Sequence, residues 1–235
     1  TLGIHSGITM FNYQKIIYSE EENIILKRMN KVFQQTYTRF LDLQKAEEQA
    51  REAQIEVALE RVRAAAMAMR HSEDLKECTK VVFDELEKLE LNMERSGIGI
   101  FDPETRDCQL YTTVLNPEGK KELSLGVTSL TIHPLLIQTF EAWEKQEALS
   151  YTLEGKDLKN YYDIVSHSEF ILSEEVLEKS SALPKEYYHY CPFSAGGLYF
   201  FSDIEPTAED KTIIKRFAEV FDLTYTRFLD LQKAE

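Results

Sequence analysis

The chain has 235 residues, with 27 Lys and Arg against 41 Asp and Glu, so its formal net charge is −14. This charge excludes a surface that meets nucleic acid as a whole, because a polyanion would be repelled. No apolar run is long enough to cross a bilayer, and the first residues do not resemble a signal peptide. Three Cys without paired spacing predict a reduced, cytoplasmic protein.

The N-terminal part carries half of an internal repeat. Residues 7–13 are predicted to form a strand, and a helix is predicted to follow. The sequence YTRFLDLQKAE occurs at residues 37–47 and again at residues 225–235, an offset of 188 residues. A period this long is outside the range of about 20–50 residues of solenoid units, so it predicts tandem domains. We therefore interpret residues 1–26 as the C-terminal remnant of a preceding unit.

A long linker helix is predicted next, over residues 27–70. From residue 8 to residue 96, a stretch of 89 residues, there is neither Gly nor Pro. One helix over 27–70 would be roughly 66 Å long, so its middle must be solvated or paired with another chain. Apolar residues in its second half follow the 4-3-4-3 spacing of a coiled coil, and we expect them to form the seam of a parallel homodimer. The seam residues are Ile55, Leu59, Val62, Ala66 and Met69.

Helices and strands alternate irregularly over residues 71–224. Helices are predicted at 75–89, from Pro134, within 157–180 and from Thr207. Strands are predicted at residues 97–101, 108–114, 123–130, 148–152, 186–193 and 198–202, with turns at 102–105 and 116–119. The order predicts an α+β domain with one central antiparallel sheet flanked by helices. The first and last helices are expected on the same side of this sheet.

This order resembles a GAF domain. The linker sequence AQIEVALERVRAAAMAMRHSEDL at residues 53–75 and the motif YTRFLDLQKAE are similar to linkers between tandem GAF-like units of multidomain bacterial regulators. The resemblance implies a sensor domain over 71–224, a signalling helix before it, and the start of the next linker helix at 225–235. It also implies a two-component, cyclase or transcriptional context. The Asn-Lys-Phe-Asp-Glu motif of cyclic-nucleotide-binding members and the Cys-His pair of bilin-binding members are absent, so no cofactor is assigned.

The sequence offers little that points to catalysis. It has no phosphate loop, no HExxH, no CxxC and no Ser in a nucleophile elbow, so we expect neither catalytic residues nor a metal site. His71 lies where a histidine kinase would carry its phosphoacceptor. Arg70-His71-Ser72-Glu73 lacks the context of that motif, however, and we interpret His71 as a His at a helix C-terminus before a Ser cap.

Aromatic residues carry the prediction of a ligand pocket. In the strand at 186–193, Tyr187, His189 and Cys191 share one face, and Tyr188 and Tyr190 share the other. An aromatic lining with polar tips suits a flat or amphipathic ligand, although the same residues can be ordinary core and rim residues. The candidate ligand-binding residues are Tyr111, Trp143, Tyr162, Tyr187 and His189.

Two functions follow from these observations. The first is a cytoplasmic sensory and signal-relay module that reads a small molecule or a partner state and transmits the signal through a dimeric helix. The second is a ligand-free scaffold, or spacer, that also dimerises. An enzyme would need a cleft of converging titratable groups, which the sequence does not indicate.

Overall fold

The computed structural model describes residues 7–11, 13, 17–71, 74–115, 121–166, 172 and 174–234. The chain forms two compact units, Thr1–Gln54 and Ile55–Glu235. The first unit contains most of α1 (Glu20–Ala68), and the second, which we call the globular unit, contains the end of α1 and the other helices and strands given below. The strand predicted at 7–13 is not confirmed. Of its described residues only Gly7 makes a bridge, and the others have no extended pairing.

Six strands form one antiparallel sheet in the order β3-β2-β1-β6-β5-β4, which confirms the predicted α+β class. They are β1 (Arg95–Phe101), β2 (Asp107–Leu115), β3 (Lys121–Ser129), β4 (Leu149–Glu154), β5 (Lys185–Phe193) and β6 (Gly196–Ser202). The β1–β2 hairpin turns at Asp102, whose Oδ1 accepts hydrogen bonds from the backbone N–H groups of Glu104 (2.8 Å) and Thr105 (3.1 Å). The turn predicted at 116–119 lies outside the described residues.

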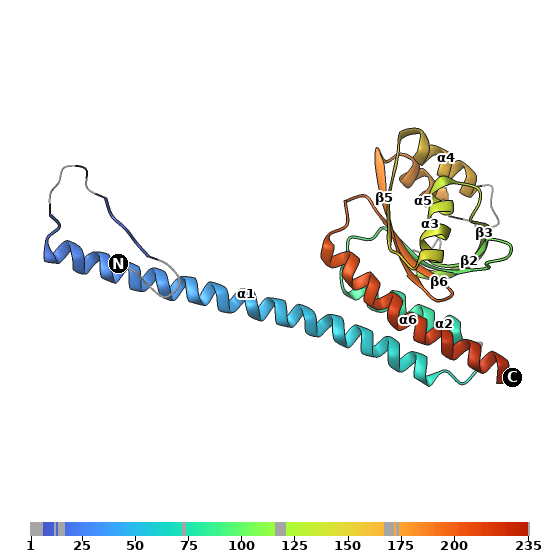
Figure 1. Cartoon of the computed structure of the whole chain (residues 1–235), viewed down its shortest axis with the longest axis horizontal. Coiled ribbons are helices and arrows are strands. Elements are labelled where there is room, and N and C mark those ends of the chain that lie inside the picture. Colours follow the sequence, from blue (N-terminus) through green and yellow to red (C-terminus); the bar gives the residue numbers. More distant parts are fainter. Residues whose placement is uncertain are drawn as a thin grey trace. The chain divides into compact units, whose positions relative to one another are not determined.

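Helices cover both faces of the sheet (Figure 1). On one face lie α2 (Leu75–Lys88) and α6 (Ala208–Ala234) together with the end of α1, as expected for the first and last helices. On the other face lie α3 (Pro134–Lys145), α4 (Gly155–Ser166) and α5 (Glu174–Ser181). Because side chains alternate along a strand, each strand contributes to two separate cores.

The first core lies between the sheet and helices α1, α2 and α6. Its strand residues include Ile98, Leu198 and Phe200, all fully buried. Ile55, Leu59 and Val62 of α1 are buried in the same core, and Ala66 and Met69 are buried beside Cys78 of α2 and Phe228 of α6.

This burial differs from the prediction of a seam open to a second chain. The 4-3-4-3 spacing identified the buried stripe of the helix, but the chain's own sheet and helices cover that stripe. The spacing of apolar residues predicts which face of a helix is buried, but it does not predict what buries that face. A coiled coil and a helix packed on a sheet therefore give the same pattern.

The domain boundary is also earlier than the sequence indicated. The predicted division put the linker helix at 27–70 and the domain at 71–224, whereas the globular unit begins at Ile55. Of the segment 225–235, which was expected to start a further linker, residues 225–234 are the continuous end of α6. There Tyr225 and Phe228 pack against the first core, so this segment belongs to the globular unit.

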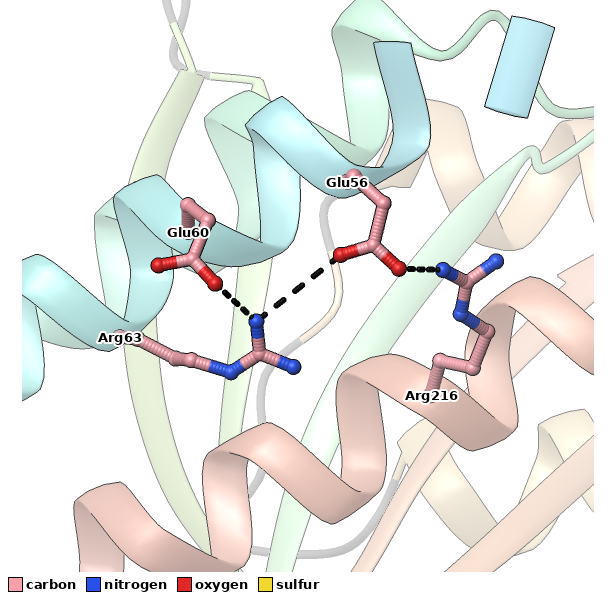
Figure 2. A network of polar contacts seen from close by, with 4 residues as sticks. All are labelled: Glu56, Glu60, Arg63 and Arg216. Carbon is pink, nitrogen blue, oxygen red and sulfur yellow. Dashed lines mark hydrogen bonds and ion pairs between the residues drawn. The ribbon is translucent and has the colours of Figure 1, made fainter. Parts of the chain in front are cut away.

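A polar network on the surface joins α1 to α6 within the globular unit (Figure 2). Arg216 Nη2 of α6 lies 2.5 Å from Oε1 of Glu56 on α1. The other oxygen of Glu56 lies 4.0 Å from Arg63 Nη1, which also contacts Glu60. Exposed pairs of this kind contribute less than about 1 kcal/mol each, so apolar burial holds the two helices together.

Candidate functional site

The second core contains a cavity of about 40 Å³ between the sheet and helices α3 and α4. Four tyrosines line it: Tyr161 of α4, Tyr188 and Tyr190 of β5, and Tyr199 of β6. Apolar side chains such as Leu136 and Val165 fill most of the remaining wall. The lining of the cavity is therefore mostly apolar, with a few polar groups, and this pattern is typical of small-molecule sites.

Close approach to glycine makes room for two of the tyrosine rings. A Cβ on Gly97 would lie 2.2 Å from the hydroxyl oxygen of Tyr199, and one on Gly197 would lie 2.0 Å from a ring carbon of Tyr190. Each glycine sits in the central part of the sheet, on β1 and β6 respectively. The hydroxyl ends of the two rings lie over these positions because no side chain stands there.

Arg95 is the cation of the site. It opens β1, and its guanidinium carbon lies 4.0 Å from the centroid of the Phe201 ring. Its Nη2 donates a hydrogen bond of 3.2 Å to the hydroxyl of Tyr162, which in turn donates one of 2.5 Å to Oε2 of Glu186. The tyrosine thus connects a buried cation to a buried carboxylate. Figure 1 labels α4, β5 and β6, which supply Tyr162, Glu186 and Phe201.

Two polar atoms of the cavity wall are buried and unsatisfied. Nη1 of Arg95 and Oγ1 of Thr128 have no hydrogen-bond partner within the part of the chain that the structure describes. An unsatisfied buried polar group costs about 1–3 kcal/mol, and more when it is charged. Such groups facing a cavity indicate a place where a ligand or ordered water completes the hydrogen bonds.

Burial and neighbouring charges shift the pKa values of the ionisable groups at the site. Burial by itself would lower the pKa of Arg95, but the oxygen-bearing side chains around it, Tyr162 foremost, raise the pKa above its ordinary value. Burial raises the pKa of Tyr161 to about 12 and that of Tyr188 well above its usual range. Burial also raises the pKa of Glu186, against the opposing effect of Arg95. The wall therefore presents a permanent cation and neutral hydroxyls.

A histidine cap fixes the start of α3 beside this wall. Nδ1 of His133 accepts a hydrogen bond of 3.1 Å from the backbone N–H of Leu135, so a neutral His133 carries its proton on Nε2. That nitrogen lies 3.3 Å from Oδ1 of Asp157, whose Oδ2 accepts a hydrogen bond of 3.0 Å from Tyr151. Burial lowers the pKa of His133 despite the carboxylate. Because the helix cap occupies Nδ1, we interpret this His–Asp pair as structural.

None of the five residues predicted to bind a ligand lines this cavity. Tyr111 packs against the first core, and His189 is buried on that same side, against Phe200. Tyr187 lies half-buried near Lys185.

The other two predicted residues lie around the cavity. Trp143 of α3 packs edge-on against Phe101 at 5.5 Å, and its Nε1 donates to the carbonyl oxygen of Phe193. Tyr162 lies one step behind the wall, between Arg95 and Glu186.

The candidate set predicted from the sequence leaves out Arg95 and the four tyrosines of the wall, although Tyr161 belongs to the helical insertion where a pocket was expected. The alternation of Tyr187 to Tyr190 was recognised correctly, but the two candidates taken from this strand, Tyr187 and His189, came from the face opposite the cavity. The signal for Arg95 is a basic residue that opens an otherwise apolar strand, RSGIGIF. A basic residue at a strand end indicates a polar site only when its charged group is buried, which the sequence alone does not show.

Outside this cavity, the described residues lack the groups that metal or thiol chemistry would need. They contain no group of three or more His, Cys, Asp or Glu that could hold a metal ion. The three cysteines are free and buried, and burial raises the pKa of Cys78 to about 11 and that of Cys191 to about 12. Within the same residues, no helix is both long enough and apolar enough to cross a membrane.

Comparisons with known proteins gave structural matches only. No family model matches the chain, and no curated protein matches it. A crystal structure of a fragment of a methyl-accepting chemotaxis protein is similar with a TM-score of 0.45 and 16% identity, covering 74% of this chain and 99% of that one. A structure described as the GAF domain is similar with a TM-score of 0.43 and 11% identity, covering 74% of this chain and 88% of that one.

Proposed function

We propose that this chain is a sensory and signal-relay module of a multidomain regulator, and that its cavity holds a small carboxylate such as acetate. The observation that carries the proposal is the buried, unsatisfied Nη1 of Arg95 on the cavity wall. A guanidinium N–H recognises a carboxylate oxygen through a charge-assisted hydrogen bond. Thr128 supplies a second polar contact, and the apolar wall suits a short alkyl group.

The size of the cavity limits the ligand. One water needs about 10–15 Å³ by this measure of volume, so about 40 Å³ accommodates roughly three such molecules. An anion of about four non-hydrogen atoms, such as acetate or nitrate, matches this space, and propionate, with about five, tests its upper limit. A nucleotide or a chromophore is far larger, in keeping with the absence of the sequence motifs that bind them.

The strands provide a route from the cavity to the helices. Phe201 faces Arg95 and the cavity, while its neighbour Phe200 is buried on the other side of β6 in the first core. A single sheet thus separates the ligand from α6 and from the end of α1. A bound ligand that favours one arrangement of β1 and β6 would also favour one arrangement of the helices packed against these strands. Ligand binding would in this way be relayed across the sheet.

We infer a regulatory and not a catalytic role. Proton transfer near neutral pH needs a group that titrates there, and the arginine and tyrosines of the wall do not. The three free thiols fit the reducing, cytoplasmic location expected from the sequence.

A ligand-free scaffold is the second candidate, and one observation favours it. Tyr162 already joins Arg95 to Glu186, so the charge of the cation is compensated within the chain. The homodimer expected from the sequence stays a prediction, to be tested by light scattering at tens of micromolar protein. A dimer would have to use surfaces other than the five buried seam residues.

A thermal-shift experiment separates sensor from scaffold. The melting temperature of the full chain is measured in acetate, propionate or nitrate, and in chloride at the same ionic strength. A ligand at 100 times its Kd stabilises by about 2.7 kcal/mol, and in a chain of this size that raises the Tm by roughly 5–10 °C.

Two variants provide the matched comparison. Arg95→Met should abolish the shift, whereas Arg106→Met should keep it, because Arg106 is exposed and lies over the Phe140 ring instead. Equal melting temperatures in all four salts would favour the scaffold.

A further inference from the structure

The first half of α1 begins in the same way as α6. Ser19 and Glu22 form a reciprocal cap, in which the Ser19 N–H donates to Glu22 Oε2 (2.7 Å) and the Glu22 N–H donates to Ser19 Oγ (3.2 Å). Thr207 and Asp210 form the same cap with distances of 2.9 and 3.1 Å. The two caps are 188 positions apart, the offset of the sequence repeat. The repeat is therefore structural as well as sequential: residues 20–46 of α1 correspond to α6.

The two corresponding helices differ sharply in what covers their apolar faces. Met29 is 57% exposed where Phe217 is fully buried, and Val32 is 62% exposed where Val220 is 3% exposed. Phe33 is 48% exposed where Phe221 is 1% exposed. We call the apolar face formed by Ile25, Met29, Val32, Phe33, Tyr37 and Phe40 the α1 stripe. It has the residue types of a core-facing helix, but in this chain it is exposed.

We propose that the α1 stripe covers the sheet of another unit of this fold, encoded in the same polypeptide before the residues described here. The argument is the partner that α6 shows. On α6, Phe221 and Tyr225 both contact the ring of Phe193 on β5, with centroid distances of 5.3 and 6.4 Å. Phe33 and Tyr37 occupy the same two positions on α1 and stack on each other at 6.1 Å. In the preceding unit, Phe33 and Tyr37 would contact the aromatic residue that corresponds to Phe193.

The polar surroundings of the stripe agree with this partner. Arg216 of α6 pairs with Glu56 on the helix that leads into its own unit. Arg28 holds the position of Arg216 and Lys27 that of Lys215. A preceding unit with the same fold would have a carboxylate at the position that corresponds to Glu56, and Arg28 would pair with it. The α1 stripe and Arg28 would then both contact the surface of that unit.

The shape of the stripe favours a sheet over a second copy of the helix. A two-stranded coiled coil buries a narrow seam of a and d positions. The stripe includes the adjacent residues Val32 and Phe33, which lie about 100° apart around the helix. Their counterparts Val220 and Phe221 are both buried because a sheet and a neighbouring helix meet α6 over a wide face.

The consequence is a helix shared between two units. Residues 20–46 of α1 would close one sheet, while Ile55 and the residues after it already pack under the next one. A signal read in one unit would then reach its neighbour through a single continuous helix. This proposal is independent of the ligand proposed above.

Helix exchange within the full chain tests the proposal. In the matched chimera, the sequence of residues 20–46 replaces Ala208–Ala234. In the shifted chimera, the sequence of residues 22–48 is inserted instead, which turns the apolar face by about 200°. The shifted insert places Lys27, Arg28 and Lys31 at the core positions 213, 214 and 217. The two inserts have nearly the same composition and helix propensity, so only the register differs.

The matched chimera should unfold cooperatively with a Tm within about 10 °C of the parent, and the shifted chimera should lose its cooperative transition. Because Asn30 would take the fully buried place of Ala218, a third chimera carries Asn30→Ala in the insert. The proposal is overturned if the matched chimeras, with and without this change, unfold no more cooperatively than the shifted one. It is also overturned if the full chain is a dimer that Met29→Glu converts to a monomer, since the stripe would then join two copies.

Discussion

Leu59→Ala tests whether the end of α1 is part of the globular unit. Leu59 is 1% exposed and lies in the first core with α2 and α6. Removing a buried leucine side chain costs about 2–5 kcal/mol, because the lost burial adds to the cavity that remains. We expect about 3 kcal/mol, which corresponds to a Tm lower by roughly 6–12 °C.

Val57→Ala is the matched control on the same helix. Val57 is 50% exposed, and Ala has the higher helix propensity, so we expect a change within about 0.5 kcal/mol. Urea unfolding followed by tryptophan fluorescence measures both variants, since the single tryptophan, Trp143, reports on the globular unit. Equal stabilities for the two variants would refute the assignment of residues 55–68 to this core.

Protein concentration distinguishes the core from an intermolecular seam. If the chain itself covers Leu59, the urea midpoint does not depend on protein concentration. If a second chain covered it, the midpoint would rise with concentration, because association stabilises by mass action. A midpoint that rises over a hundredfold range of concentration would show association, and it would restore the seam expected from the sequence if Leu59→Ala removed the rise and Val57→Ala kept it.

Three further predictions follow from the site and the sheet. Gly97→Ala should destabilise by about 1–3 kcal/mol in urea unfolding, because the new methyl group would displace the Tyr199 ring; no loss would mean that the ring has room to move. Thr128→Val should stabilise the ligand-free protein by about 1 kcal/mol, since it removes an unsatisfied buried hydroxyl of similar shape; a loss instead would show that the hydroxyl is hydrogen-bonded in solution. Burial lowers the pKa of His189 from 6.5 to about 4, so below pH 6.5 the unfolded chain takes up a proton that the folded chain does not, and stability falls as the pH falls. Between pH 7.5 and pH 5 this loss is about 2 kcal/mol in the parent. His189→Gln should lack that part of the pH dependence, and identical slopes for both proteins would contradict the shift.

Much of the fold could be predicted from local patterns. Alternation in segments such as CQLYTTV and the Gly and Pro punctuation after Ser96 located the strands and the β1–β2 hairpin, because both signals depend on neighbours in sequence. The long helix was equally clear. What covers a helix depends on residues far away in sequence, and Leu59 shows the limit, since the same 4-3-4-3 spacing fits a coiled coil and a helix packed on a sheet.

The candidate site was harder to predict for a related reason. The sequence separates Tyr187 and His189 from Tyr188 and Tyr190 but does not state which pair meets the cavity. That depends on which helices cover each face of β5, a long-range property. Arg95 was missed because one basic residue at the start of a strand is usually a solvated end. Only the structure reveals that its Nη1 is buried and unsatisfied.

The most direct test of the account is hydrogen exchange of the full chain in 100 mM acetate and in 100 mM chloride. The central claim is that an anion beside Arg95 is sensed across the sheet by the helices of the first core. We predict slower exchange in β1 and β6 and also in residues 55–68, with no difference between the two salts for Arg95→Met. Unchanged exchange in residues 55–68 of the parent, while β1 becomes protected, would show a ligand site without a relay. Identical exchange throughout the parent in both salts would contradict the proposed acetate site itself.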